Sequence, residues 1–268
     1  MATVVLSRST PDWGYLRRLI TFALAWIGAL VSVAVAVQDR PGLGDAHVYW
    51  AGWHGPLYAG GFVYPPVGAL LFAPAAVLSW PVFAALWVAA LSVAGLWLLW
   101  PLPVRLRIPF GLALAAAISW GNAATLLAVP LALAPRWPAA WAALAWTKVT
   151  PAVGMVALAG QRRWRDLAVA LGVCSALGIG VLVVAPSLVA AWATQLQTHS
   201  EVPSYYLAIL PWRPSLPVRV VLAAVIAWKG ASRPWTLVVA AALATPDLSF
   251  ATYGILAAAP RLMDSTRS

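Results

Sequence analysis

The chain has 268 residues, of which 63% are apolar and only 9% are charged. A mean hydropathy of +0.85 is more than the core of a water-soluble domain of this length needs, so the composition excludes a soluble globular protein and predicts a polytopic membrane protein. The net charge of +10 comes mainly from arginines beside apolar runs. No basic run is long enough to follow a nucleic-acid backbone, so we expect contact with a membrane and not with nucleic acid.

The apolar runs predict an all-α transmembrane bundle of about nine spans, within a range of eight to ten, several of them short or broken. In chain order they are 19–37, 67–78, 82–100, 109–119, 123–134, 138–159, 167–185, 218–228 and 235–259. The first run has 19 residues, close to the roughly 20 that cross a hydrocarbon core, and we interpret it as an anchor and not as a removed signal peptide.

The second run is too short to cross a membrane alone, because helical residues rise only about 1.5 Å each. Either it extends back through Tyr64-Pro65-Pro66, where proline suits a first helical turn, or its start is recessed in the membrane. Linkers and convincing internal repeats are absent from the sequence. We therefore expect residues 1–268 to form a single integral membrane domain.

The positions of the basic residues predict the orientation, because positively charged loops face the cytoplasm. With a cytoplasmic N-terminus, nine alternating spans put the basic loops around 162–165 and 229–233 inside. The two longest loops, 38–66 and 186–217, then lie on the outer face of the cell membrane. Because both are rich in polar and aromatic residues, we expect the outer face to be the working face. The exceptions to the charge rule in this arrangement are Arg105, Arg107 and Arg136.

Asp45 is the leading candidate for chemistry in the first long loop. A carboxylate at a membrane interface is suited to accept a proton from a hydroxyl group. The alternative is a helix N-cap, since Gly44-Asp45 precedes a segment that fits a helix start. Asp39 competes for the role, but beside Arg40-Pro41 it resembles a solvated turn.

Aromatic rings and imidazoles surround Asp45 in this loop and are candidates for binding a substrate. Rings in such a loop stack on sugars or orient hydroxyl groups, but Trp and Tyr are also ordinary anchors at the level of lipid headgroups. The candidates are His47, Tyr49, Tyr58 and Tyr64.

Lys148 is the second informative residue, because it lies near the middle of the apolar run 138–159. A central lysine costs roughly 2.5 to 3.5 kcal/mol on insertion scales, so such a cation usually faces a cavity, a counter-ion or an anionic ligand. Pro151 interrupts the helix beside it and frees backbone carbonyls. The alternative is a lysine whose amine reaches an interface.

In the second long loop, His199 and Arg213 are the polar candidates, and a cation such as Arg213 would suit a phosphate leaving group. Gly121-Asn122 is interpreted as a turn between two short spans. Cys174 is the only cysteine, which leaves neither a disulfide framework nor a Cys/His metal spacing. We therefore expect no metal site and no cofactor.

The spacing of these residues resembles a known enzyme family. Asp45-x3-Tyr49, followed by Leu57-Tyr58 and Tyr64-Pro65-Pro66, is similar to the first luminal loop of glycosyltransferase family 87. These GT-C membrane enzymes use polyprenyl-phosphate-linked sugars, typically mannose. Lys148-x-x-Pro151, followed by an apolar run and Gln161-Arg162-Arg163-Trp164-Arg165, is similar as well. The segment 246–253 departs from the family pattern, with one extra residue, Phe250 for Trp and Thr252 for His.

The resemblance, which covers roughly residues 15 to 170, implies a GT-C-like fold and an inverting mannosyltransferase. Asp45 would be the general base, and Lys148 would hold the phosphate of the lipid-linked donor. The acceptor would be a lipid-linked molecule or a glycan. The lack of a DxD pair favours a lipid-phosphate donor over a nucleotide sugar. Two alternatives stay open: a transporter or lipid flippase, and a non-catalytic relative with a shortened chain.

Overall fold

The computed structural model describes residues 13–58, 61–199, 214–245 and 250–264. These residues form helices joined by turns and contain no β-strand, which confirms the predicted all-α class. The elements are α1 (Trp13–Asp39), α2 (Gly44–Gly52), α3 (Pro66–Ala69), the 3-10 helix η1 (Leu70–Val77), α4 (Trp80–Leu99), α5 (Val104–Ile118), α6 (Ala124–Leu133), α7 (Ala140–Ala145), the 3-10 helix η2 (Thr150–Met155), α8 (Val156–Gly160), α9 (Trp164–Val184), α10 (Pro186–His199), α11 (Leu216–Lys229), α12 (Thr236–Ala244), the 3-10 helix η4 (Phe250–Ala258) and α13 (Ala259–Asp264).

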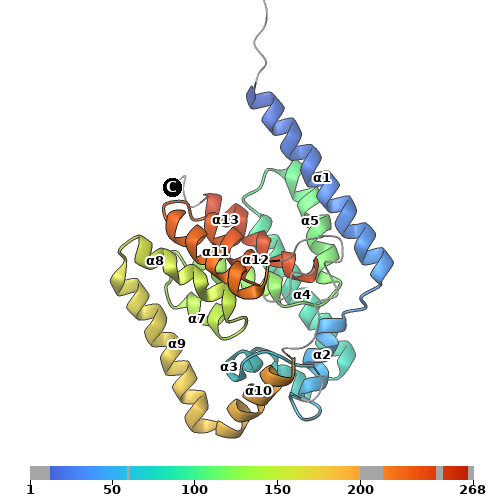
Figure 1. Ribbon diagram of the computed structural model, residues 1–268. Helices are drawn as coiled ribbons and strands as arrows, with labels where there is room; N and C mark the ends of the chain where they lie inside the picture. The colour runs from blue at the N-terminus through green and yellow to red at the C-terminus, as the bar shows by residue number, and fades with distance from the viewer. Residues whose placement is uncertain (1–12, 59–60, 200–213, 246–249, 265–268) are drawn as a thin grey trace, which may run out of the picture.

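Among the described residues, three helices are long and apolar enough to cross a membrane: α1 from Arg18, α4 and α9. In the apolar stretches of α1 and α9 only 6% of the residues are buried, against 44% in α4. Helix α4 is therefore central, and the other two helices flank the bundle (Figure 1). Their exposed residues include Leu30 at 63% and Val183 at 75%. Such surfaces are unfavourable in water and fit contact with lipid.

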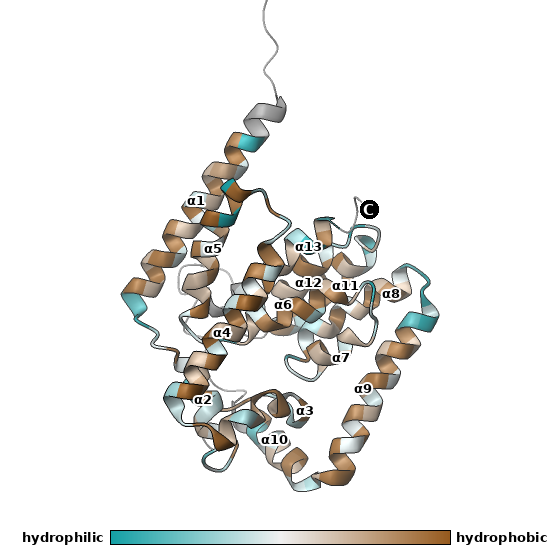
Figure 2. Cartoon of the chain, turned by 180° about the vertical axis from the view of Figure 1, so that it is seen from behind, coloured by the Kyte–Doolittle hydropathy of each residue, from teal (hydrophilic) through white to brown (hydrophobic). Residues whose placement is uncertain are grey.

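The hydrophobic surface of the two flanking helices is visible in Figure 2, where both are predominantly brown along their length. Hydrophilic segments lie near both ends of α1 and near the end of α9 that follows α8. This distribution is typical of helices whose middle faces hydrocarbon and whose ends reach the headgroups.

The other predicted spans are shorter or interrupted in the structure. Helices α5, α6 and α11 have 15, 10 and 14 residues. The region 235–259 is divided, because Thr245 takes an extended ψ of 128° immediately before Pro246, as residues before proline prefer. Nine full-length spans are therefore not seen in the described part of the chain.

The run 138–159, predicted to be a span that Pro151 interrupts, is divided further than the sequence indicates. Three short helices, α7, η2 and α8, occupy this region, and residues 146–149 form a break between the first two. Pro151 lacks an N–H and its ring clashes with the carbonyl four residues earlier, so an α-helix cannot continue through this point. Lys148 thus lies at a break in the backbone and not inside a continuous helix.

Two hydrophobic cores organise the bundle, and α4 contributes to both. The larger core contains residues of α4 to α9 and α11 to α13, with Trp141 and Leu131 almost fully buried. The smaller core is aromatic and joins α2, α3 and η1 to the part of α4 that contains Phe83 and Trp87. Tyr58, Phe62 and Tyr64 also belong to it. The smaller core contains the predicted first-loop site.

Candidate functional site

Asp45 meets Asn122 across a gap of 77 residues in the sequence. The Asn122 side-chain nitrogen donates a hydrogen bond of 2.6 Å to Asp45 Oδ2. Its side-chain oxygen accepts a bond of 2.9 Å from the backbone N–H of Ala124 at the start of α6. Asn122 is buried, with 8% of its surface exposed, and Asp45 is half-buried. The two bonds fix which way the amide faces and hold the carboxylate in one orientation.

Gly121 lets the turn before α6 approach the first turn of α2 this closely. Its φ is +71°, and a Cβ there would lie 2.6 Å from the Ala46 Cβ, so only glycine fits without displacement. The Trp87 indole N–H donates to the Gly121 carbonyl at 2.8 Å, and the Asp45 backbone N–H donates to the Trp120 carbonyl at 3.0 Å. The Gly121-Asn122 turn therefore packs directly against the first turn of α2, which carries the candidate base Asp45.

The N-cap interpretation of Asp45 is wrong. Helix α2 begins at Gly44, its N-cap position is Leu43 in a left-handed conformation, and no side chain caps it. Asp45 instead lies inside the first turn, where the helix dipole favours a negative charge. Asp39 is the last residue of α1 and is exposed, so the two carboxylates differ in their surroundings.

Three of the predicted substrate-binding residues, Tyr49, Tyr58 and Tyr64, are buried in the aromatic core. They are 4%, 6% and 4% exposed. The hydroxyl groups of Tyr49 and Tyr64 lie 3.0 Å apart, and the Tyr58 hydroxyl donates to the Tyr64 carbonyl at 3.1 Å. The ring of Phe72 packs against that of Tyr49, with centroids 4.2 Å apart and the planes tilted by 39°. The three rings belong to the core against which α2, the helix that carries Asp45, packs.

Burial raises the pKa of the Tyr49 hydroxyl well above its usual value, and the neighbouring Tyr64 and Asp45 raise it further. Burial also raises the pKa of Tyr58. Both hydroxyl groups therefore stay protonated across the physiological range and serve as hydrogen-bond donors, not as proton acceptors.

His47 is exposed and lies on a different face of α2 from Asp45. Two residues along an α-helix correspond to a rotation of about 200°, which separates the two side chains. The His47 ring instead packs edge-on against Trp80, with centroids 5.0 Å apart, and lies 5.8 Å from the ring of Trp50. The structure does not bring His47 together with Asp45.

Lys148 is half-buried in the break between α7 and η2. The break packs directly on α3, because a Cβ at Gly68 would overlap the Trp146 carbonyl and would lie 3.1 Å from the Thr147 Cα. The turn that carries Lys148 is thus in backbone contact with the helix that follows Tyr64-Pro65-Pro66. This contact joins Gly68 and Trp146, which are 78 positions apart in the sequence.

Helix α10 from the second long loop lies against the first long loop. The Trp192 indole N–H donates to the Val63 carbonyl at 3.1 Å, and Leu188 and Trp192 pack on the aromatic core. His199 ends α10, and its side chain lies outside the described residues, as does Arg213 altogether. The two loops that were predicted to share a face are in contact.

Sequence reasoning undervalued Asn122 and missed Arg219. Gly121-Asn122 was interpreted as a turn between two short spans, and no role in the site was predicted for Asn122. Arg219 is 7% exposed within α11 and donates to the Thr245 carbonyl at 2.7 Å, where α12 ends. An arginine inside the apolar run 218–228 was the signal that could have identified it.

The described residues contain no group of three or more His, Cys, Asp or Glu side chains placed to hold a metal ion. Comparison of the chain with protein-family models, with curated proteins and with solved structures finds no match.

Proposed function

We propose that the protein is a membrane glycosyltransferase that moves a sugar, by family resemblance mannose, from a polyprenyl-phosphate donor to a lipid-linked or glycan acceptor. The observation that carries the proposal is the 2.6 Å hydrogen bond from Asn122 to Asp45. A carboxylate held by a buried amide, at the edge of an apolar bundle, has the fixed orientation that a general base requires.

The proposed reaction is a single displacement with inversion at the anomeric carbon. Asp45 accepts the proton of the acceptor hydroxyl, whose oxygen forms a bond to C1. The bond between C1 and the phosphate oxygen breaks, and the lipid phosphate leaves with the electron pair. A carboxylate offers about four lone-pair sites, so the bond from Asn122 leaves Asp45 able to accept a proton. Phosphate is a good leaving group, so one carboxylate suffices.

Lys148 is proposed to stabilise the charge on the departing phosphate. The contact of its turn with α3 at Gly68 supports this role, since α3 follows Tyr64 of the aromatic core in the chain. Arg213 is the second candidate for this role on sequence grounds. A preorganised cation near a developing negative charge lowers the barrier more in a water-poor site than in water.

We also propose that the N-terminus is cytoplasmic and that Asp45 faces the outside of the cell membrane. The contact between α10 and the first long loop supports a common working face for the two loops. The protein would then meet both a lipid-linked donor and its acceptor at the outer surface of the bilayer.

The test is transfer of radiolabelled mannose from polyprenyl-phosphate-mannose to a lipid acceptor by protein purified into lipid. Asp45→Asn keeps the size and polarity of the side chain but removes the base, so we expect a rate lowered about 10²- to 10⁴-fold. Asp39→Asn is the matched control and should transfer at nearly the normal rate.

A near-normal rate for Asp45→Asn would overturn the assignment of the base. Wild-type protein that moves the lipid-linked sugar across the bilayer without transferring it would instead identify a flippase. Donor binding, measured with the same labelled lipid, should be unchanged in Asp45→Asn because the amide is nearly isosteric.

A further inference from the structure

The end of α5 and the start of α2 define one side of the bundle, called here the α2 side. The Leu43 backbone N–H donates to the Ser119 carbonyl at 2.9 Å, and that of Asp45 donates to the Trp120 carbonyl at 3.0 Å. The C-terminal ends of α1 and α5 therefore lie on the same side, and these two helices pack against each other. In Figure 1, α2, α3 and α10 lie together at the lower end of the molecule.

The segment formed by α3 and η1 begins and ends on the α2 side. Tyr64, just before α3, bonds to Tyr49 of α2 at 3.0 Å. Leu78, just after η1, accepts a hydrogen bond of 2.8 Å from the indole of Trp50, the next residue of α2. Because both ends meet adjacent residues of one short helix, this apolar segment turns back and does not cross the bundle.

Helix α4 then leads away from the α2 side. It starts at Trp80, whose ring contacts His47, and its 20 residues extend about 30 Å. At its far end, Arg107 donates to the Trp100 carbonyl at 2.7 Å, and Arg261 donates to the Trp97 carbonyl at 2.6 Å. We call this end of the bundle the basic side.

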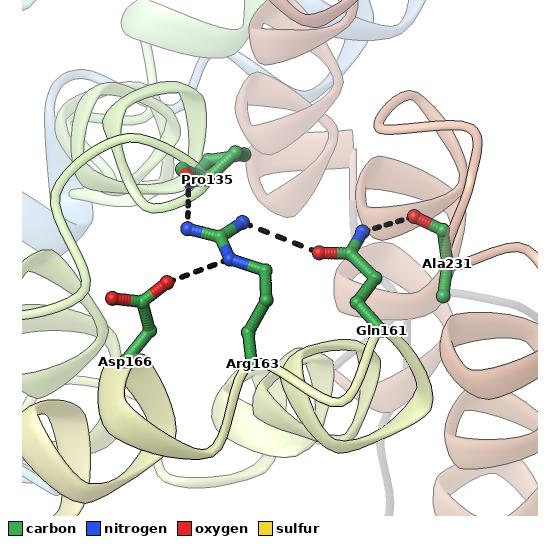
Figure 3. Close-up of polar contacts among 5 residues, drawn as sticks. All are labelled: Pro135, Gln161, Arg163, Asp166 and Ala231. Atoms are coloured by element: carbon green, nitrogen blue, oxygen red, sulfur yellow. Dashed lines mark hydrogen bonds and ion pairs between the residues drawn. The ribbon is translucent and has the colours of Figure 1, made fainter.

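The segment formed by α7, η2 and α8 begins and ends on the basic side. Arg163 follows α8 and donates to the carbonyl of Pro135, which precedes α7, at 2.8 Å (Figure 3). The same guanidinium bonds to Asp166 at 2.6 Å and to the Gln161 side chain at 3.2 Å. The tip of this hairpin is the break that carries Lys148 and contacts α3 at Gly68.

A third segment, α12 and η4, has the same form. It starts after Arg233, beside Ala231, whose carbonyl accepts a hydrogen bond from Gln161 (Figure 3). It ends at α13, where Arg261 reaches the far end of α4. In between, Gly254 packs against Thr125 at the start of α6. Both ends of this segment lie on the basic side.

We propose that the chain crosses the membrane six times, through α1, α4, α5, α6, α9 and α11, and that the three hairpins return to the side from which they enter. The shortest crossing, α6, and the hairpin tip that contacts Gly68 are packed inside the bundle, where recessed backbone is tolerated. The basic residues Arg105, Arg107, Arg136, Arg163 and Lys229 then lie on one face, against the anionic headgroups of the cytoplasmic leaflet.

This arrangement removes the three exceptions to the charge rule at Arg105, Arg107 and Arg136 and leaves Arg40, at the end of α1, on the outer side. Nine alternating spans put Arg105, Arg107 and Arg136 outside, whereas six crossings put them inside with Arg163. The bond between Arg163 and the Pro135 carbonyl requires the second arrangement, because nine alternating spans would put these two residues on opposite sides of the membrane. The arrangement stands whether or not the protein transfers a sugar.

Single cysteines in a Cys174→Ala background distinguish the two arrangements. Ser79→Cys lies outside with six crossings and inside with nine, and Arg136→Cys has the opposite prediction. Both residues are exposed, so the variants should fold. Gly55→Cys, outside in both arrangements, and Arg165→Cys, inside in both, are the controls. The measurement is labelling by a membrane-impermeant maleimide in right-side-out and inverted vesicles.

We expect Ser79→Cys to label with Gly55→Cys, and Arg136→Cys to label with Arg165→Cys. The reverse pattern at either position would overturn the proposal in favour of alternating spans. A cysteine that reacts only after the vesicles are dissolved in detergent lies within the lipid and would equally contradict the proposal at that position.

Discussion

The Asn122 amide connects two elements at once, since its nitrogen binds Asp45 in α2 and its oxygen binds the backbone of Ala124 in α6. Its removal would free the carboxylate to rotate. A misplacement of about 1 Å at a reacting group is enough to cost roughly 10²-fold in rate. The orientation of the base therefore depends on a residue that contacts no substrate in the proposed reaction.

For this reason we expect Asn122→Ala to lower the rate of sugar transfer about 10- to 100-fold while donor affinity stays normal. A lost hydrogen bond to a charged group also costs about 1.5 to 3 kcal/mol of stability, which thermal unfolding measures. Gln161→Ala is the matched control, because it removes an amide that binds a carbonyl on the basic side. Equal losses of transfer in both variants would show that the loss reflects folding and not the position of Asp45.

Among the elements, α3 and the break before η2 make the closest approach in the candidate site. Glycine at position 68 permits it, because any larger side chain would overlap the carbonyl of Trp146. The tip of one hairpin is thus held against the start of another, and the two enter the bundle from opposite sides. The depth of Lys148 depends on this contact.

Gly68→Val should force the two hairpins apart. Overpacking of a close contact usually costs about 1 to 3 kcal/mol, so we expect a lower temperature of thermal unfolding together with weaker binding of the polyprenyl-phosphate donor. Gly172→Val is the control, because a Cβ at Gly172 would meet no atom within 4 Å. Normal stability and donor affinity in Gly68→Val would contradict the role assigned to this contact.

At the scale of the whole molecule, the hairpins gather the basic loops on one face. Each Lys or Arg near an anionic membrane surface contributes about 1 kcal/mol of attraction. Among the described residues, the α2 side has no comparable group of basic residues, although Arg40 at the end of α1 is an exposed cation there. The two leaflets therefore meet different surfaces of the protein.

We expect anionic lipid to raise the unfolding temperature of the protein in lipid nanodiscs relative to zwitterionic lipid, and high salt to remove the increase, because salt screens exposed charges. The double substitution Arg136→Gln with Arg165→Gln should reduce the increase, whereas Arg40→Gln should leave most of it. An increase that depends equally on Arg40 would argue against a single basic face.

The sequence alone determined the class of the protein, the three longest helices and the carboxylate of the candidate site. These depend on local properties: apolar composition, the length of a run and the chemistry of Asp45 in its loop. The break at Lys148 was partly predictable, because proline at position 151 interrupts a helix. The sequence did not show that the rest of the run 138–159 forms three short helices.

Only the tertiary structure decided which apolar segments turn back and which residue holds Asp45. An apolar run has the same composition whether it crosses a membrane or returns, and the difference lies in what its two ends contact. Tyr64 and Leu78 reach neighbouring residues of α2, and Asn122 reaches Asp45 across 77 residues. Contacts between residues so far apart in the sequence depend on how the whole bundle packs. A local sequence pattern does not predict them.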